Sequence, residues 1–342
     1  MHDIPVPLPP PAPAPRRPLD LLVVGDANPD LILHGGDVEP AFGQHERIVE
    51  HGTLVLGGSG AITAVGAARL GLRTAMAGAV GDDLLGRFVL GELADAGVET
   101  APVRVLGDVP TGISVALARP DDRAILTARG ALAAFDPADV PDDLLRRTRH
   151  VHIASPFLQP RLRAGLTDLI ARVHAAGATV SLDTGWDPEQ RWSTVATAVP
   201  MVDVLLPNRQ EAARLATALP AVNPRPGTPV PDAPPADDQL AAALLIAGHG
   251  PLVVVKSGAE GAAAVHGGTV VQGAARRVDA VDATGAGDSF DAGFLAGWLD
   301  GADLSAAVAL GCACGALSTR YAGGTGGQPN RTEAEAFLAV GA

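Results

Sequence analysis

The sequence predicts an α/β protein with a mostly parallel central sheet and a small additional β-sheet. From Val151 onward, short apolar runs alternate with helical segments, which is the order of elements in a parallel sheet covered on both faces. Before that point, residues 113–117 alternate apolar with small or polar side chains and precede a second run at 123–128. This pattern predicts a hairpin with one solvated face. Together with the run at 47–56, the hairpin can form a small separate sheet.

Length and composition limit the class of protein. A chain of 342 residues can form one large α/β domain or two small ones. Although 47% of the residues are hydrophobic, no uninterrupted apolar run reaches the length of a membrane span. The amino terminus lacks the basic and apolar regions of a secretory signal. We therefore expect a cytoplasmic protein without a membrane partner, preceded by a proline-rich tail at residues 1–18 that is extended and poorly ordered.

Charge and cysteine content exclude further classes. The formal net charge is −13 and Lys256 is the only lysine, which argues against binding to a nucleic-acid backbone. Cys312 and Cys314 stand two positions apart on a predicted helix, where they point in different directions. They suit neither a disulfide nor a four-ligand metal site, and small core residues in a reducing cytoplasm are the better interpretation.

The first half of the chain supplies a strand at 21–24, and polar residues follow it at the edge where open α/β sheets bind ligands. Apolar and β-branched runs predict the further strands, and small-residue or periodic stretches predict the helices. The expected strands are 31–33, 47–56 and 74–80, and the expected helices run from about 57 to 71 and from 84 to 96.

The second half continues the alternation. Strands are expected at 150–153, 179–182, 202–206 and 252–255, with helices at about 162–175, 189–197, 208–218 and 236–248. A hairpin at 262–265 and 270–273 precedes helices at about 287–299, 303–320 and 332–340. The proline-rich segment 219–235 has no periodicity and is expected to be a surface insertion.

The turn Gly285-Ala286-Gly287-Asp288 precedes one of these helices. Such a turn directs several backbone N–H groups and the positive end of the helix dipole at one point, which favours an anion. A carboxylate at this point would repel the anion, so its presence suggests a chemical role. That role would be to take a proton from a reacting hydroxyl. The alternative is an ordinary helix-capping aspartate.

Other short motifs are ambiguous when each is taken alone. Gly57-Gly58-x-Gly60 suits a tight turn, and Asn208-x-x-Glu211 suits a helix-capping pair. Gly81-Asp82-Asp83 with Gly86 suits a helix cap. Their meaning depends on the order in which they occur.

In this order, the motifs resemble the ribokinase-like (PfkB-type) carbohydrate and nucleoside kinases, from about Leu21 to Leu338. The most specific match is Asp282-Ala283-Thr284-Gly285-Ala286-Gly287-Asp288. Supporting matches are Gly25-x-x-Asn28-x-Asp30, Gly57-Gly58, Gly78-x-Val80-Gly81-x-Asp83-x-x-Gly86, Thr111-Gly112, Asn208-x-x-Glu211 and Lys256-Ser257-Gly258-x-x-Gly261.

The resemblance implies a ribokinase-like three-layer α/β/α domain over residues 19–342, with a small β-sheet lid from about 31–56 and 111–130. It also implies ATP-dependent phosphorylation of a small hydroxylated substrate, and a homodimer formed through the lid, because a small sheet with open edges invites pairing.

By this resemblance, Asp288 is the catalytic base and Gly285, Ala286 and Gly287 form the anion hole for the phosphoryl group. Asn208 and Glu211 share one helical face near Mg²⁺ and the phosphates, with the metal bound through water. On the nucleotide side, Lys256 points toward the phosphates, Gly258 and Gly261 line the cleft, and Cys312 closes the adenine side. Asp183 is a further candidate for the phosphate and metal region, and a monovalent cation near Asp282 and Thr284 occurs in the family.

The acceptor side matches at Asp30, Asn28, Gly57 and Gly58, where a carboxylate can accept hydrogen bonds from sugar hydroxyls. One departure concerns the substrate, because the asparagine of the family's Gly-Gly-x-x-x-Asn motif is Ile62 here. A sugar kinase is the leading hypothesis and a nucleoside kinase is the runner-up. A non-catalytic ligand-binding regulator is a third alternative. A dinucleotide oxidoreductase is disfavoured because no Gly-x-Gly-x-x-Gly follows the first strand.

Overall fold

The computed structural model describes residues 17–119, 123–220 and 239–340. The expected proline-rich tail at 1–18 lies almost entirely outside these residues, and so does most of the expected insertion at 219–235. Within the described ranges, no helix is both long and apolar enough to cross a membrane.

The central sheet has nine strands in the order β13-β12-β11-β10-β9-β8-β1-β4-β5. The strands from β11 to β5 run parallel, and β12 and β13 extend the sheet with antiparallel pairing. Its strands are β1 (Leu19–Val24), β4 (Thr74–Gly81), β5 (Val103–Leu106), β8 (Thr148–Ala154), β9 (Thr179–Asp183), β10 (Val204–Leu205), β11 (Leu252–Lys256), β12 (Ala262–His266) and β13 (Thr269–Gly273). This arrangement confirms the predicted mostly parallel sheet.

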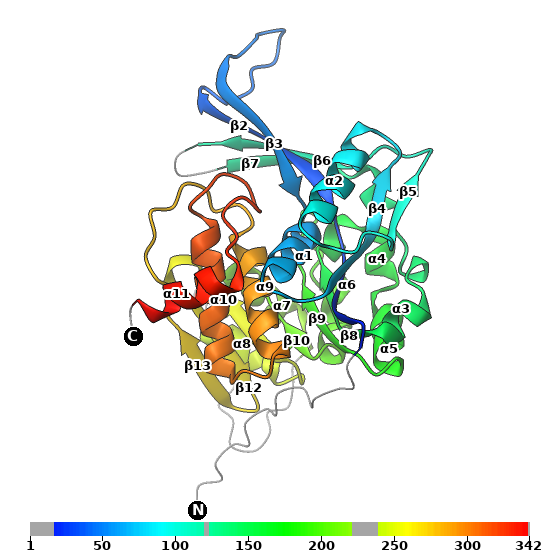
Figure 1. Cartoon of the computed structure of the whole chain (residues 1–342), viewed down its shortest axis with the longest axis vertical. Helices are drawn as coiled ribbons and strands as arrows, with labels where there is room; N and C mark the ends of the chain where they lie inside the picture. Colours follow the sequence, from blue (N-terminus) through cyan, green and yellow to red (C-terminus); the bar gives the residue numbers. More distant parts are fainter. Residues whose placement is uncertain (1–16, 120–122, 221–238, 341–342) are drawn as a thin grey trace, which may run out of the picture.

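Helices cover both faces of this sheet, which gives the three layers seen in Figure 1. Successive residues of a strand point to opposite faces of the sheet, so Leu22 and Val24 belong to one apolar cluster and Leu21 and Val23 to the other. The first cluster contains residues from α3 (Asp142–Arg147), α4 (Pro160–Ala164), α5 (Leu166–Ala175), α6 (Ser193–Ala196), α7 (Arg209–Ala218) and α8 (Gln239–Ala247). The second contains residues from α1 (Ser59–Arg69), α2 (Leu84–Asp95), α9 (Ala286–Leu299), α10 (Leu304–Ser318) and α11 (Arg331–Ala339).

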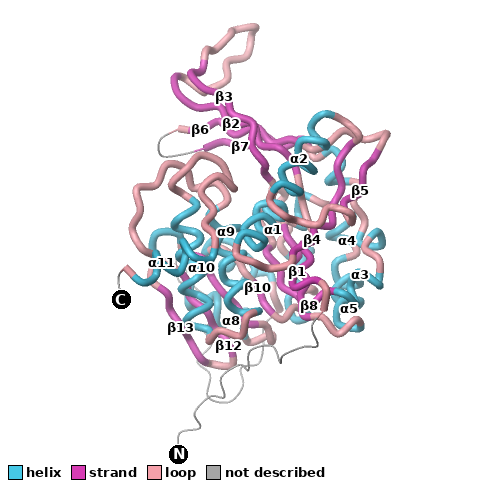
Figure 2. The backbone as a smooth tube through the Cα atoms, in the orientation of Figure 1, coloured by secondary structure: helices cyan, strands magenta, loops and turns pink. Residues whose placement is uncertain are grey.

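A separate four-stranded sheet, here called the lid, projects from one end of the molecule (Figures 1 and 2). Its order is β3-β2-β6-β7, formed by β2 (Asn28–Gly36), β3 (Val49–Gly57), β6 (Ile113–Ala118) and β7 (Arg123–Ala128). Two antiparallel pairs are joined by the parallel pair β2–β6. The predicted small sheet is therefore present, and β2 is longer than the strand expected at 31–33.

Other differences from the predicted elements have local causes. The helix expected at 189–197 is reduced to α6, because the Asp187 carboxylate accepts hydrogen bonds from the backbone N–H groups of Glu189 and Arg191 and folds that stretch into a turn. The helix expected at 162–175 is divided at Gly165 into α4 and α5. Strand β5 and helix α3 were not predicted. Short 3₁₀ helices occur at Gly130–Ala133, Pro137–Asp139, Pro156–Leu158, Val199–Met201 and Gly258–Glu260.

Two histidines lie fully buried in strand β8, on the face that packs against α9. His150 forms hydrogen bonds with Thr179 Oγ1 (2.7 Å) and Ser181 Oγ (2.8 Å), and His152 Nδ1 forms one with the same Ser181 Oγ (2.8 Å). The edge of Trp298 contacts His150 at 5.3 Å between ring centroids. Burial lowers the pKa of His150 well below its usual value and lowers that of His152 to about 4, so both rings are neutral in the folded protein.

We expect these histidines to make stability depend on pH. The unfolded chain takes up a proton at each ring below pH 6.5 or so, whereas the folded protein does not, so stability is lost as the pH falls from there toward 4. Each ring contributes about 1.4 kcal/mol per pH unit in that window. In urea titrations at pH 7.5 and pH 5, His152→Leu should lose less stability on acidification than the wild type. Equal losses in the two proteins would contradict this assignment.

Candidate active site

The predicted site residues gather at the carboxyl ends of the parallel strands, beneath the lid. Asp26 follows β1, Asp183 ends β9, Lys256 ends β11, and α9 begins beside them with Asp288 in its first turn. Because these strands are neighbours or near neighbours in one parallel sheet, residues far apart in sequence meet at one edge.

The glycine turn before α9 has the geometry of an open helix terminus. Gly285 has a left-handed backbone (φ +69°), and no described side chain caps the helix. A Cβ at Gly285 would lie 2.7 Å from Gly324 Cα and 3.1 Å from Ile62 Cγ2, so only glycine fits. The first turn of α9 can therefore offer its backbone N–H groups to an anion.

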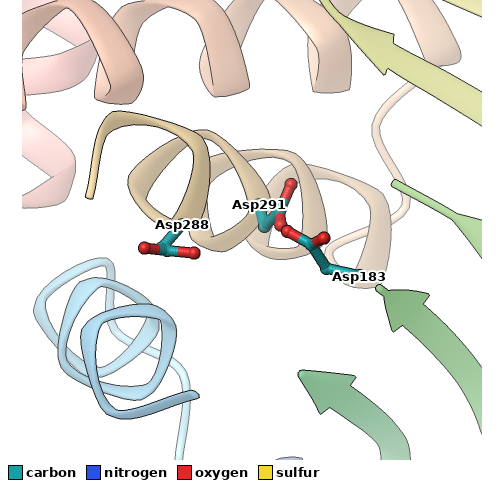
Figure 3. Close-up of side chains that lie close together, drawn as sticks. All are labelled: Asp183, Asp288 and Asp291. Atoms are coloured by element: carbon teal, nitrogen blue, oxygen red, sulfur yellow. The ribbon is translucent and has the colours of Figure 1, made fainter. Parts of the chain in front are cut away.

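Asp288 lies in this first turn, and its carboxylate projects from α9 nearer the start of the helix than Asp291 (Figure 3). Burial raises its pKa to about 7, and the negative charges of Asp183 and Asp26 act in the same direction, whereas Lys256 opposes them. A carboxyl group with this pKa exchanges its proton near neutral pH, as a general base must.

Lys256 lies between two buried carboxylates, and Asp183, Lys256 and Asp291 are here called the carboxylate–lysine cluster. Lys256 Nζ donates to Asp183 Oδ2 at 2.7 Å and to Asp291 Oδ2 and Oδ1 at 2.9 and 3.0 Å. Burial would raise the pKa of Asp183, but the charge of Lys256 and the hydrogen bonds to this carboxylate together lower that pKa to about 2. One ammonium cannot neutralise two buried carboxylates, so burial raises the pKa of Asp291 well above its usual value.

This cluster changes the picture of Lys256. The sequence suggested an ammonium directed at nucleotide phosphates, and the structure gives it two carboxylate partners inside the protein. Asp291 was missed by sequence reasoning. The available signal was its position three residues after Asp288 on an otherwise apolar helix, which places both on one helical face. Figure 3 shows the carboxyl groups of Asp291 and Asp183 facing each other, one turn further along α9 than Asp288.

Asn208 and Glu211 form a capping box at the start of α7. Asn208 Oδ1 accepts a hydrogen bond from Glu211 N (2.9 Å), and Glu211 Oε2 accepts one from Asn208 N (2.8 Å). Burial and the charge of Asp183 raise the pKa of Glu211 to about 8. Asn208 also adjoins the end of β11 at Lys256, so the pair borders the carboxylate–lysine cluster.

Hard oxygen donors and excess negative charge meet at this edge. Asp183, Asp288 and Asp291 each place an oxygen within 4.8 Å of the others. Glu211 is close enough that the charges of Asp183 and Asp288 raise its pKa. Lys256 already binds Asp183 and Asp291, which leaves Asp288 and Glu211 to face any added cation. Such an oxygen-rich set fits Mg²⁺, which takes few protein ligands and retains water.

A cavity of about 360 Å³ opens beside the start of α9. Its volume is within the range of about 300–1,000 Å³ that is typical of ligand pockets. Cys312 Sγ lies 3.7 Å from Gly273 O on one wall, and burial raises the pKa of this thiol to about 11, so it is a neutral wall residue. The lining includes the expected nucleotide-side residues together with apolar ones: Lys256, Gly258, Gly261, Ala275, Val278, Ala286, Gly287, Phe290, Cys312 and Ala316.

The acceptor-side residues are also brought together. Asn28 Nδ2 donates to Asp30 Oδ1 at 2.9 Å and to Ser114 Oγ at 3.3 Å. A Cβ at Gly57 would lie 2.1 Å from the Asp30 carboxyl carbon, and one at Gly58 would lie 2.8 Å from Asp26 O. The glycine pair therefore allows Asp30 to lie against the backbone. Burial raises the pKa of Asp30 to about 6.

Ile62 supports the anion loop from behind. It is buried and packs against Gly285 and Gly324, and its carbonyl accepts a hydrogen bond from Gln328 Nε2 at 2.9 Å. The replacement of the family asparagine thus puts an apolar side chain beneath the turn.

Asp282 and Thr284 are occupied by internal contacts. Asp282 Oδ1 accepts hydrogen bonds from Thr284 N and Oγ1, and Asp282 Oδ2 accepts one from Gly323 N. Arg123 of strand β7 donates to Thr284 Oγ1 at 2.9 Å, which connects the lid to the loop before α9.

The buried position of Lys256 leads to a stability prediction. Lys256→Met leaves two carboxylates without their cation, and breaking such a pair should destabilise the protein by about 3–5 kcal/mol. Arg331→Met is a matched control, because the Arg331–Asp300 pair is partly exposed and should contribute only about 0–1 kcal/mol. Chemical denaturation of both variants measures the difference. Equal, small effects would show that the cluster does not stabilise the fold.

Comparison with known proteins shows the family to which this chain belongs. The chain is 28% identical over 337 residues to a 5-dehydro-2-deoxygluconokinase of Bacillus thuringiensis subsp. konkukian, covering 94% of this chain and 95% of that protein. A solved structure of Arabidopsis thaliana ribokinase complexed with ribose and ATP is 25% identical, with a TM-score of 0.78 and coverage of 94% and 98%.

Adenosine kinase from Sinorhizobium meliloti is also 25% identical, with a TM-score of 0.78 and coverage of 94% and 99%. Residues 19–331 match the sequence profile of the pfkB family carbohydrate kinases. The chain therefore belongs to the pfkB family of carbohydrate kinases.

Proposed function

We propose that this kinase transfers the γ-phosphoryl group of ATP to a hydroxyl of a small sugar or sugar-like substrate, with Asp288 as the base. The observation that carries the proposal is the first turn of α9, where a carboxyl group with a pKa of about 7 stands beside an uncapped helix terminus. Proton removal and charge stabilisation are the two contributions that phosphoryl transfer requires besides positioning.

In this proposal, Asp30 and Asn28 hold the substrate hydroxyls through their carboxylate and amide groups. Asp288 takes the proton of the acceptor hydroxyl as that oxygen attacks. The backbone N–H groups of Gly285, Ala286 and Gly287 stabilise the charge that gathers on the phosphoryl oxygens. The carboxylate–lysine cluster holds the ends of β9 and β11 against α9 beneath these groups.

We assign ATP to the cavity beside α9, with Gly258 and Gly261 along the nucleotide and Cys312 on its apolar wall. Asn208 and Glu211 are the residues to which we assign Mg²⁺, through water. When bound, the metal neutralises phosphate charge. The carboxylate oxygens that gather at this edge support a cation there.

The acceptor class follows less directly from the site. The curated relatives that resemble this chain are named 5-dehydro-2-deoxygluconokinases, which favours a gluconate-like acceptor. A nucleoside is the second candidate, because Ile62 is apolar where the family places an amide and a similar structure is an adenosine kinase. Phosphorylation assays with Mg²⁺·ATP on 5-dehydro-2-deoxygluconate, ribose and adenosine separate these acceptors. Turnover of none of them, nor of a broader sugar panel, would refute the proposed activity.

Asp288→Asn should fold but lose turnover by about 10²-fold or more, because the base is gone. In the wild type, kcat/KM should rise with pH and level off above about 7, since Asp288 must be deprotonated to accept the proton. Steady-state assays from pH 5.5 to 9 test both points. Near-normal turnover in Asp288→Asn, with an unchanged pH profile, would remove Asp288 from the chemistry.

We also propose a homodimer formed through the lid. Its two edge strands, β3 and β7, expose Leu54, Ile125 and Leu126, with Ile125 and Leu126 more than half exposed. Open edges with apolar side chains favour pairing. Analytical ultracentrifugation should give a dimer that Leu126→Asp converts to monomer. A monomer at all wild-type concentrations would count against the lid as an interface.

A further inference from the structure

Three arginines outside the residues assigned so far converge on one carboxylate. Arg129 Nη2 lies 3.8 Å from Glu189 Oε1, Arg163 Nη1 lies 3.7 Å from Glu189 Oε2, and Arg191 also contacts Glu189. We call Arg129, Arg163, Arg191 and Glu189 the arginine cluster. In a chain with a formal net charge of −13, such a local concentration of guanidinium groups calls for an explanation.

The cluster lies at the same sheet edge as the proposed acceptor site. Arg163 is on α4, which follows β8, and Glu189 and Arg191 follow β9. Strand β8 lies between β9 and β1, and β1 leads directly into Asn28 and Asp30. The loops after β8 and β9 also touch, because a Cβ at Gly185 would lie 3.2 Å from Ser155 Oγ.

Arg129 connects the cluster to the acceptor residues through the lid. It directly follows β7, and Thr127, two residues earlier, has its Oγ1 3.1 Å from Ser114 Oγ. That serine hydroxyl in turn accepts the 3.3 Å hydrogen bond from Asn28 Nδ2. A short series of contacts thus joins the arginine cluster to the residues that hold the sugar hydroxyls in the proposed function.

The charges in the cluster do not balance. Three guanidinium groups face Glu189, and the other nearby carboxylate, Asp187, accepts hydrogen bonds from the backbone N–H groups of Glu189 and Arg191. Among the described residues, Glu189 is the only carboxylate that pairs with these three guanidinium groups, so positive charge is in excess. In the described part of the chain, neither Arg129 nor Arg163 has a side-chain hydrogen bond within 3.5 Å, because both lie slightly too far from Glu189.

Nearby polar groups are also incompletely satisfied. Within the described residues, Gln159 Oε1 and Thr184 Oγ1 are buried without a hydrogen-bond partner. Gln159 precedes the helix that carries Arg163, and Thr184 follows Asp183 on the loop that carries Glu189. Buried polar atoms normally have partners, so an ordered water can complete these two groups.

We propose that Arg129 and Arg163 bind the carboxylate of the substrate, so that the acceptor is a sugar acid rather than a neutral sugar or a nucleoside. A guanidinium offers two parallel donors that match the two oxygens of a carboxylate, and Glu189 occupies that position in the absence of substrate. The inference rests on the proposed function, because it names the acceptor class of the same site. Arg129 and Arg163 determine specificity here and take no part in proton transfer.

The test compares one acid with its neutral counterpart. The probes are 5-dehydro-2-deoxygluconate and the primary amide of the same acid, which keeps the carbon skeleton and removes the charge. The wild type should prefer the acid. Arg129→Gln and Arg163→Gln should each raise KM for the acid about tenfold or more, as expected for the loss of a charged hydrogen bond, with kcat and the KM for the amide little changed.

Glu189→Gln should change KM for the acid in the opposite direction to the arginine variants. Removing the competing carboxylate should lower KM for the acid, which a merely structural role of Glu189 would not do. Arg104→Gln is the matched control, because Arg104 pairs with Asp139 near β5 at the far edge of the sheet and should leave both KM values unchanged. Thermal melting of each variant checks folding.

The outcomes separate the two proposals. Equal kcat/KM of the wild type for acid and amide, or equal rises of KM for both probes in the arginine variants, would overturn the carboxylate subsite while leaving the kinase activity intact. A higher KM for the acid in Glu189→Gln would overturn it as well. If the wild type phosphorylates neither probe but does phosphorylate ribose or adenosine, the acid specificity is wrong. If it phosphorylates no acceptor at all, both the acid specificity and the proposed kinase activity are wrong.

Discussion

The active edge of this kinase depends on one buried interaction, the contact of Lys256 with Asp183 and Asp291. It connects the end of β11, the end of β9 and the first turns of α9, which are the elements that carry the cavity, the acidic edge and Asp288. Without the ammonium, three carboxylates would lie within 4.8 Å of one another with no internal cation. The only lysine in the chain thus makes it possible to concentrate carboxylates at the edge where we propose that the base and the metal act.

The aspartates at this edge have different pKa values because their electrostatic environments differ. Asp183 is ionised far below neutral pH because it contacts the ammonium, whereas burial and neighbouring negative charges raise the pKa of Asp288 to about 7. A base needs the second environment, and a structural anchor benefits from the first. The two residues lie close together at one edge, so the difference arises over a few ångströms.

Much of this arrangement could be predicted from the sequence. Strand and helix periodicity indicated the parallel sheet, and the family resemblance grouped Gly57 with Asp30, which the structure places against it. The partners of Lys256 could not be predicted, because Asp183 and Asp291 are distant in sequence and only the order of the strands brings them together. The arginine cluster escaped notice for the same reason, since Arg129, Arg163 and Arg191 come from three separate segments. The Asn208–Glu211 pair shows a different limit, because a capping box and a position beside the acidic edge are both present in the structure.

The lid strand β2 begins with the residues to which we assign the acceptor and ends at the outer part of the lid. Asn28 and Asp30 are among its first residues and Gly36 is its last, so the proposed sugar contacts are part of the lid itself. Gly57, which faces Asp30, belongs to the neighbouring lid strand β3, so a movement of the lid would carry both residues together. In the proposed function, the position of the lid therefore sets the position of the groups that hold the acceptor, and a dimer formed through the lid would fix both.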